Sequence, residues 1–366
     1  MNPQKTPAKD PAKDPATGGA TGPANTQAPG GAVRSAEAAG QRACDPANAR
    51  SRLLKGAYPL QSGPRPSAVG LRYSLGRRLT DRDREIAIAV HRHRVLLARH
   101  IADMFFSTRK RGLVRLRTLA DLGVLDRFRI LARTGEPNEY HYVLGRVGAS
   151  IVAAEHGGDP DAAARRWRGD TALVLARGQR LAHAIGISGF YAGLAAEARQ
   201  GRGRLAEWMT EAESARWSEG VVRPDGLGVW AEDGREVEFF LEYDRGTETL
   251  ARLAAKLDGY RRFEEERGAS AWVLFAFTSP GREARARSAL HGADVPTASA
   301  VLGPDDRPSG AVWSPVGAGG RLRLAELADA PKPHEAEARA AQGSLRAWRF
   351  ARSPTDDPQE APIDQP

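Results

Sequence analysis

Apolar residues recur at helical spacing from residue 80 onward, after a polar stretch that is rich in Ala, Gly and Pro. Thr80 is a favoured N-cap residue, and the acidic side chains after it suit the positive end of a helix dipole. Intervals of three and four residues continue over 96–105 and 107–122, and Gly123 provides a C-terminal stop. The pattern therefore predicts three consecutive helices. The apolar stripe expected on the third helix is Leu113, Leu116, Leu119 and Ala120.

The pattern then changes to the two-residue period of strands. Residues 125–131 alternate, the loop 134–139 turns the chain, and 140–144 return as a second strand. A short helix over 149–155 follows and ends at the Gly-Gly-Asp-Pro of 157–160. Three helices followed by a two-stranded ribbon is the layout of a winged helix-turn-helix domain, in which the third helix enters the major groove of DNA.

Basic side chains lie on the third helix and on the ribbon. The candidate DNA contacts are Arg109, Lys110, Arg111, Arg115, Arg127 and Arg129. Arginine and lysine bind phosphates, and arginine also recognises guanine in the major groove. A solvated, Arg-rich face in an Arg-rich protein is the alternative interpretation. Because helix order and charge agree, we expect this domain to bind double-stranded DNA.

The second half of the chain alternates between strands and helices. The expected order is helix 170–200, strand 204–210, a turn or short helix 211–217, strand 237–244, helix 248–267, strand 270–278, helix 283–291 and strand 296–302. This alternation predicts an α/β sheet with right-handed crossovers, to which 308–313 and 321–327 add a hairpin or flap. We expect Gly186 and Gly189 to interrupt the first helix. His183 on the same helix is either a satisfied interior group or a functional one.

Acidic residues gather around the strand over 237–244. Glu242 and Asp244 share one face of that strand, and a polar turn brings the segment that carries Asp225 back beside it. Two carboxyl groups so close together do not readily ionise at the same time, so a cation is expected among them. A divalent metal ion is the usual solution where oxygen ligands cluster, and Arg245 and Lys256 compete for the same role.

These residues resemble the PD-(D/E)XK nuclease fold. Pro224-Asp225 matches the first half of that motif and Glu242 the second, but Asp244 occupies the position of the motif's lysine. Some members carry the lysine on the following helix, where Lys256 is the candidate. The resemblance implies that Asp225 and Glu242 bind a divalent metal such as Mg²⁺, with Asp244 as a third oxygen ligand or a substitute. It also implies that Lys256 positions water, which makes these four the candidate catalytic residues.

The chain from about 78 to 327 is similar to the replication-relaxation family of plasmids and integrative elements. The segments that carry the likeness are LAHAIGISGFYAGL, RPDGLGVW, FFLEYDRGTET and LAAKLDGYRRF. Membership would imply a role in plasmid replication and DNA relaxation, with relaxase or replication proteins as further partners. The family supplies no catalytic residue to match here.

Charge and composition complete the expected organisation. The formal net charge of +9 favours an anionic partner such as nucleic acid. The single cysteine, Cys44, excludes an internal disulfide framework, and no run of about 18 apolar residues occurs, so we expect a cytoplasmic, non-membrane protein. The expected domains are a winged helix-turn-helix over 77–156 and an α/β nuclease-like domain over 168–327. The Pro- and Ala-rich segments 1–76 and 328–366 are expected to be disordered tails.

Three functions follow from these features. The first is a DNA-binding protein of plasmid or mobile-element replication with a metal-dependent nuclease domain, or with a nuclease scaffold whose acidic face only pairs with Arg245 and Lys256. The second is a non-enzymatic transcription regulator whose α/β domain binds an effector or a partner. The third is a structural protein that bridges DNA through its winged helix and its basic tails together. An open acidic site favours the nuclease, whereas an enclosed apolar pocket favours the regulator.

Overall fold

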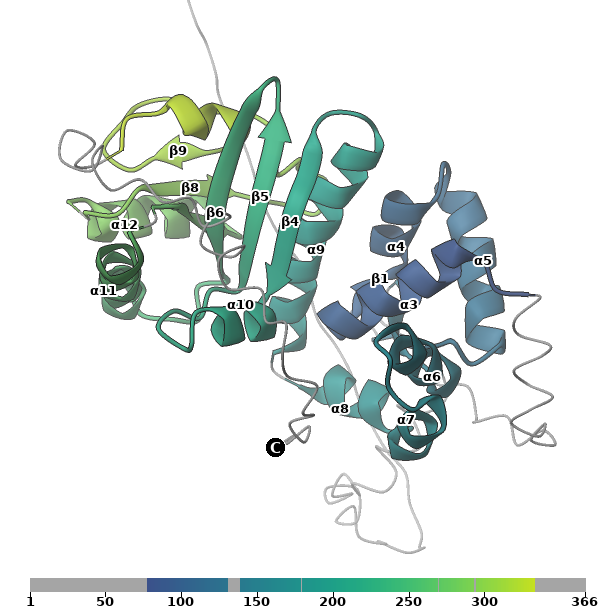
Figure 1. Ribbon diagram of the computed structural model, residues 1–366. Coiled ribbons are helices and arrows are strands. Elements are labelled where there is room, and N and C mark those ends of the chain that lie inside the picture. Colours follow the sequence, from purple (N-terminus) through teal and green to yellow (C-terminus); the bar gives the residue numbers. More distant parts are fainter. Residues whose placement is uncertain (1–77, 131–138, 179, 269, 293, 333–366) are drawn as a thin grey trace, which may run out of the picture. The chain divides into compact units, whose positions relative to one another are not determined.

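The computed structural model describes residues 78–130, 139–178, 180–268, 270–292 and 294–332 (Figure 1). The expected tail over 1–76, most of the expected tail over 328–366 and most of the ribbon loop lie outside the described residues. Within them the fold is α+β, with ten α-helices, one antiparallel sheet and one mixed sheet. Among the described helices, none is both long and apolar enough to cross a membrane.

The first half of the described chain is mainly helical. Its elements are α3 (Asp81–His93), β1 (Leu96–Leu97), α4 (Ala98–Phe105), α5 (Arg109–Asp121), β2 (Leu125–Phe128), β3 (His141–Leu144), α6 (Arg146–Glu155), α7 (Pro160–Arg166), α8 (Thr171–Arg177) and α9 (Leu181–Arg199). The three predicted helices and the two predicted strands are all present. The helix expected over 149–155 begins three residues earlier, at Arg146.

Polar side chains fix where these helices begin. Asp83 accepts hydrogen bonds from the backbone N–H of Thr80 at 2.7 Å and from its hydroxyl at 2.8 Å, which satisfies the first turn of α3. The hydroxyl of Thr108 accepts a bond from the N–H of Arg111 and caps α5. The sequence predicts the first of these starts, at Thr80, whereas the third helix was expected to begin at 107 and begins two residues later, at Arg109.

The small sheet has the order β1-β3-β2, and all its pairs are antiparallel. The sequence does not predict β1, because Leu96 and Leu97 fit the start of a helix equally well. Pairing with Tyr142 and His141 of β3, which follows α4, α5 and β2 in the chain, makes them a strand. The core below this sheet includes Ile86, Ile101, Leu116, Leu119 and Leu125, all almost fully buried.

One apolar residue of the predicted stripe on α5 does not face the core. Leu113 is 47% exposed, whereas Leu116 and Leu119 are fully buried. Gly112 takes the inward position instead, and a Cβ atom there would lie 2.7 Å from the Cβ of Ala102 on α4. The expectation for Leu113 was therefore wrong, because α4 and α5 approach too closely for a larger side chain to lie between them.

The second half is built on a six-stranded sheet. Its elements are β4 (Arg204–Thr210), α10 (Glu211–Trp217), β5 (Gly226–Glu232), β6 (Arg235–Asp244), α11 (Leu250–Arg267), β7 (Trp272–Phe277), α12 (Pro280–Leu290), β8 (Thr297–Val301), β9 (Ser314–Pro315) and the 3-10 helix η1 (Ala325–Asp329). The predicted elements follow one another in the expected order, but β5 was not among the expected strands. The single helix expected over 170–200 is instead two helices, α8 and α9. The expected hairpin over 308–313 and 321–327 is reduced to one bridge, between Trp313 and Leu322.

The strand order of this sheet is β4-β5-β6-β7-β8-β9. β4, β5 and β6 form an antiparallel meander, whereas β6, β7 and β8 are parallel and are joined through α11 and α12. The β5–β6 turn places Asp233 and Gly234 at positive φ, as a tight Asp-Gly hairpin requires. α9 covers one face of the sheet, while α11 and α12 cover the other (Figure 1). Both faces of β6 are therefore buried.

The two glycines of α9 do not interrupt the helix, which runs unbroken from Leu181 to Arg199. A Cβ atom at Gly186 would overlap the ring of Tyr243 on β6. At Gly189 it would lie 3.3 Å from the ring of His100. A glycine inside a helix costs about 1 kcal/mol relative to alanine. Close packing of these two rings on α9 offsets that cost, and the sequence alone does not show it.

An ion pair links α3 to α10. Both oxygens of Glu213 accept hydrogen bonds from the guanidinium of Arg92, each at 2.8 Å, and one of them also accepts the N–H of Thr210. Burial opposes the charge, but these bonds outweigh it and lower the pKa of Glu213 from 4.5 to about 2. Ionised Glu213 therefore stabilises the fold above about pH 4.5, and this contribution is lost as the pH falls from 4.5 towards 2.

We expect Glu213→Gln to lower the free energy of unfolding by about 2 kcal/mol at pH 7 and by clearly less at pH 3, because the substitution removes the charge. Urea unfolding at the two pH values measures the difference. Glu236→Gln is the matched control, since Glu236 is 3.5 Å from Arg204 in an exposed pair and should change stability little. An equal loss at both pH values for Glu213→Gln would mean that charge is not the cause.

Candidate functional site

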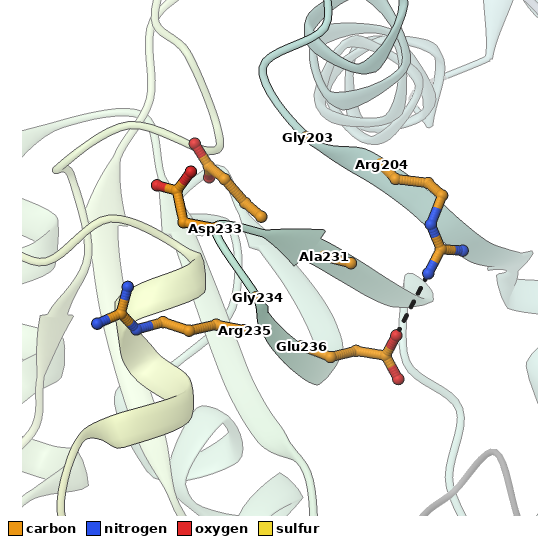
Figure 2. Close-up of a pocket in the computed structure, with 8 residues that line it drawn as sticks. Gly203, Arg204, Ala231, Asp233, Gly234, Arg235 and Glu236 are labelled. Carbon is orange, nitrogen blue, oxygen red and sulfur yellow. Dashed lines mark ion pairs between the residues drawn. The ribbon is translucent and has the colours of Figure 1, made fainter.

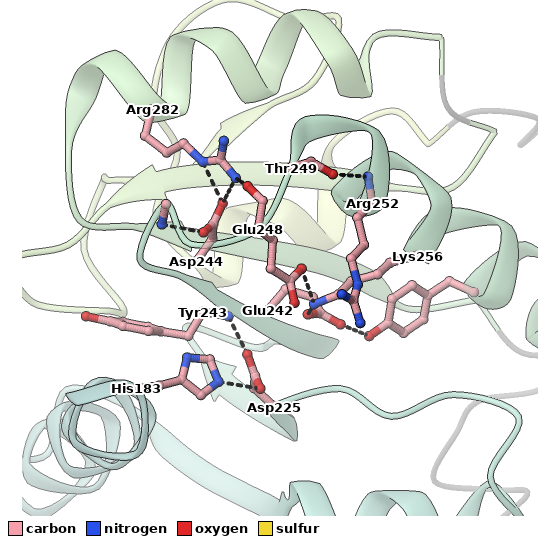
Figure 3. Close-up of polar contacts among 12 residues, drawn as sticks. His183, Asp225, Glu242, Tyr243, Asp244, Glu248, Thr249, Arg252, Lys256 and Arg282 are labelled. Atoms are coloured by element: carbon pink, nitrogen blue, oxygen red, sulfur yellow. Dashed lines mark hydrogen bonds and ion pairs between the residues drawn. The ribbon is translucent and has the colours of Figure 1, made fainter. Parts of the chain in front are cut away.

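The acidic residues meet where β5 begins and β6 ends. Asp225 directly precedes β5, and Gly226 pairs with Leu241 across the two strands. One step beyond that pair, Asp225 comes opposite Glu242 on β6 (Figure 3). The antiparallel hairpin therefore brings together two carboxylates that are 17 residues apart in the chain.

Asp225 is held by two hydrogen bonds. One carboxylate oxygen accepts the backbone N–H of Tyr243 at 2.7 Å, and the other is 2.9 Å from Nε2 of His183 on α9 (Figure 3). The bond with Asp225 raises the pKa of His183. His183 thus has a hydrogen-bond partner, as one interpretation of the sequence expects. That partner, Asp225, belongs to the acidic cluster. Nothing in the sequence pattern distinguishes this histidine, because the contact joins α9 to β5.

Glu242 is almost completely buried. Only 4% of its side chain is exposed, and it accepts hydrogen bonds from Nζ of Lys256 at 2.7 Å and from the hydroxyl of Tyr260 at 2.5 Å. Burial raises its pKa to about 7 despite the attraction of Lys256, and the charge of Asp225 adds to the increase. A carboxyl group with a pKa near 7 changes its protonation state within the pH range found in cells.

Lys256 lies four residues before Tyr260, on the same face of α11, and contacts two acidic side chains. Its Nζ atom is 2.7 Å from Glu242 and 3.3 Å from Glu248. Burial disfavours its charge, but Glu242 outweighs burial, so the pKa of Lys256 is raised and its ammonium group stays charged. The structure therefore places the lysine beside the carboxylate with which the PD-(D/E)XK resemblance pairs it.

Asp244 faces a different partner. Its carboxylate is 2.7 Å from the Arg282 guanidinium on α12 and accepts the backbone N–H of Gly246 at 2.5 Å. Arg282 also donates to the backbone carbonyl of Glu248, and both charged side chains are buried. The structure thus brings Asp225, Glu242 and Lys256 together, whereas Asp244 is neutralised beside them. Sequence spacing offered Arg245 as the cation, but the residue that binds is 38 positions away.

The oxygens of all three predicted metal ligands accept hydrogen bonds from protein groups in this structure. Asp225 and Glu242 provide the oxygen chemistry that Mg²⁺ prefers, and Mg²⁺ is commonly held by one or two carboxylates together with substrate phosphates and water. Asp244 is in addition neutralised by the buried Arg282 guanidinium, which pairs with one of its oxygens, while the N–H of Gly246 binds the other. Within the described residues, no three His, Cys, Asp or Glu side chains are arranged as a metal site.

The predicted DNA contacts on α5 differ in their surroundings. Arg109, Lys110 and Arg111 are exposed at the helix N-terminus, and Arg109 pairs with Asp103 at 2.8 Å. Arg115 instead forms a 2.5 Å ion pair with Asp83, whose side chain is 1% exposed. The guanidinium groups of the two predicted contacts on the ribbon, Arg127 and Arg129, lie over the ring of Tyr140.

A hollow of about 410 Å³ lies at the opposite end of β5 and β6 from Asp225 (Figure 2). Its lining includes Arg204, Glu232, Arg235 and Glu236, and these side chains form ion pairs within it or with neighbouring residues. A charged, open hollow of this kind differs from the enclosed apolar pocket that an effector-binding regulator needs. The acidic cluster at the other end of the strands is therefore the stronger candidate site.

Comparison with known proteins agrees with the resemblance seen in the sequence. The family model described as replication-relaxation matches residues 89–271, which is half of the chain. The match includes α5, the acidic residues and Lys256. No curated protein and no solved structure matches the chain significantly. The chain therefore belongs to the replication-relaxation family.

Proposed function

We propose that this protein binds double-stranded DNA during replication of a plasmid or mobile element, and that its acidic site hydrolyses phosphodiester bonds. The observation that carries the proposal is the arrangement of Asp225 opposite Glu242, with Lys256 bound to Glu242. Family membership supports the setting in plasmid or mobile-element replication. Relaxase and replication proteins of the same element are further partners that this setting suggests.

The first half of the chain supports the DNA-binding part. α3, α4 and α5 precede the β2–β3 ribbon, which is the element order of a winged helix-turn-helix. Lys110 and Arg111 are exposed at the start of α5, where a recognition helix contacts DNA. The ribbon adds Arg127 and Arg129. These cations suit phosphate binding and major-groove contact.

The second half supports the nuclease part. A strand that begins after Pro224-Asp225 pairs with one that carries Glu242, and a helix bearing Lys256 follows. This is the order of elements and residues that the PD-(D/E)XK resemblance requires, with the lysine moved to the helix. Asp244 is left out of the proposed site, because Arg282 neutralises it.

Each side chain of the acidic site has a role in the proposed hydrolysis. Asp225 and Glu242 would hold the divalent cation; when bound, it would lower the pKa of a water molecule and offset charge on the phosphate. Lys256 fixes the Glu242 carboxylate and adds a positive charge next to it. His183 and the backbone of Tyr243 hold the Asp225 carboxylate in place.

Cleavage of a supercoiled plasmid tests this proposal. We expect the wild-type chain to nick the plasmid with Mg²⁺ or Mn²⁺ and to lose this activity in EDTA. Asp225→Asn should reduce nicking by about 10²–10³-fold, because it removes a carboxylate that would hold the cation. The affinity for a fluorescently labelled duplex, measured by fluorescence anisotropy in EDTA, should not change.

The two halves of the proposal fail separately. A wild-type chain that binds duplex DNA but cuts it with neither metal would refute the nuclease part and leave the DNA-binding part standing. A chain that does neither would refute both. Glu283→Gln is the matched control for the acid substitution, because Glu283 is buried on α12, where it bonds Ser299 and Arg321 away from the site.

A further inference from the structure

The outward face of α5 is partly apolar. Leu113 is 47% exposed and Val114 is 60% exposed; among the described residues, these two and Val174 are the large apolar side chains that face solvent to this degree. Lys110 and Arg117 lie three or four residues from them along the helix, so all four share one face. An exposed apolar pair in such a place indicates a contact surface.

Packing within the domain fixes the direction of this face. Gly112, Leu116 and Leu119 form the buried side of α5. Because Gly112 allows α4 and α5 to approach closely, the helix cannot rotate to bury Leu113 without a clash with Ala102. The exposure of Leu113 is therefore built into the helix packing.

The charges around the apolar pair point to nucleic acid as the occupant. Lys110 and Arg117 are exposed on either side of it, and neither has an ion-pair partner in the part of the chain that the structure describes. Arg111 at the helix N-terminus adds a third exposed cation, and the acidic residue of this face, Asp121, lies at the far end. Two apolar side chains between unpaired cations suit a groove lined by phosphates.

We propose that Leu113 and Val114 recognise thymine, by contacting its 5-methyl group in the DNA major groove; this rests on the DNA binding proposed above. Thymine is the base that presents an apolar group in that groove. Val114 is branched at Cβ, so it loses little rotamer freedom when it makes the contact. Lys110 and Arg117 would contact the phosphates or guanines beside these thymines.

Substitution of single thymines by deoxyuridine tests the contact, because it removes only the methyl group. Duplexes bound by the full chain are first selected from a random pool in EDTA, which prevents metal-dependent cleavage. Each thymine of the selected site is then replaced in turn, and affinity is measured by fluorescence anisotropy. We expect a loss of about fourfold for each contacted methyl group.

Alanine variants assign each contact to its side chain. At the position that Val114 contacts, deoxyuridine should weaken the wild type but have no further effect on Val114→Ala, and likewise for Leu113→Ala at its own thymine. Val174→Ala, which shortens an equally exposed valine on α8, should keep the full response to deoxyuridine. Circular dichroism confirms that each variant is folded.

Three results would overturn the inference. The first is specific binding that no deoxyuridine substitution weakens, and the second is a selection that yields no preferred sequence. The third is unchanged DNA affinity in Val114→Ala together with an altered oligomeric state in sedimentation, which would assign this face to a protein contact. Absence of any duplex binding would instead refute the DNA binding on which the inference rests.

Discussion

Glu242→Gln is expected to lower DNA cleavage by about 10²–10³-fold while it makes the fold more stable at pH 8. The loss of cleavage follows from the loss of a carboxylate opposite Asp225. The gain in stability follows from burial, which raises the pKa of Glu242 from 4.5 to about 7. A buried acid with a raised pKa costs free energy whenever it is ionised.

The direction of the stability change follows from the pH range over which Glu242 titrates. Between pH 4.5 and about 7, folded Glu242 holds a proton that the unfolded chain has released, so stability falls as the pH rises through this window. Glutamine has no proton to lose. The free energy of unfolding of Glu242→Gln should therefore match that of the wild type near pH 5 and exceed it by about 2 kcal/mol at pH 8.

Urea unfolding at pH 5 and pH 8, combined with the plasmid assay, measures both effects. Glu264→Gln is the control, since burial also raises the pKa of Glu264, which lies eight residues after Lys256 on α11. The stability of that variant relative to the wild type should also increase as the pH rises, but the variant should cleave like the wild type. A Glu242→Gln protein that is destabilised at pH 8 would show that its ion pair with Lys256 outweighs burial.

Arg115→Ala is expected to destabilise the fold by about 3 kcal/mol, because it leaves the carboxylate of Asp83 buried without its cation. Both oxygens of Asp83 accept bonds from Arg115, and only 1% of the Asp83 side chain is exposed. Burial alone would raise the pKa of Asp83, but the bond from Arg115 and those from Thr80 lower it. Thr80 still caps α3 in the variant, so we expect a weakened fold rather than an unfolded one.

Arg109→Ala is the matched control on the same helix. Its partner Asp103 is 31% exposed, and such pairs contribute about 0–1 kcal/mol. Urea unfolding compares the two variants, and anisotropy at a temperature where both are folded compares their affinity for duplex DNA. An Arg115→Ala protein of normal stability with weakened DNA binding would show that Arg115 contacts DNA, as the sequence first suggested.

Local periodicity accounts for the parts of the fold that the sequence predicted. Thr80 and Gly123 bound the three helices, and the change from a period of three or four residues to a period of two places the ribbon. The strand over Arg235–Asp244 and the helix that bears Lys256 follow in the same way. Element type and order depend on neighbouring residues, so they can be derived without the tertiary structure.

The sequence predicts those residues of the candidate site that a single hairpin brings together. Asp225 and Glu242 are joined by a single tight turn, so alternation and turn chemistry bring them opposite each other. Lys256 lies on the next helix, within reach of the same end of the strand. The residues that decide their ionisation, such as Tyr260, become visible only when the burial of Glu242 is known.

The sequence by itself determined most of the helices and strands and their order, the basic third helix and the pair Asp225 and Glu242, but it did not predict β1, β5 or α7. Only the tertiary structure decided that Arg282 neutralises Asp244, that His183 holds Asp225 and that Arg115 pairs with Asp83. These contacts join residues 32 to 42 positions apart. Their formation depends on how helices pack on sheets, and side-chain periodicity along one element does not contain that information.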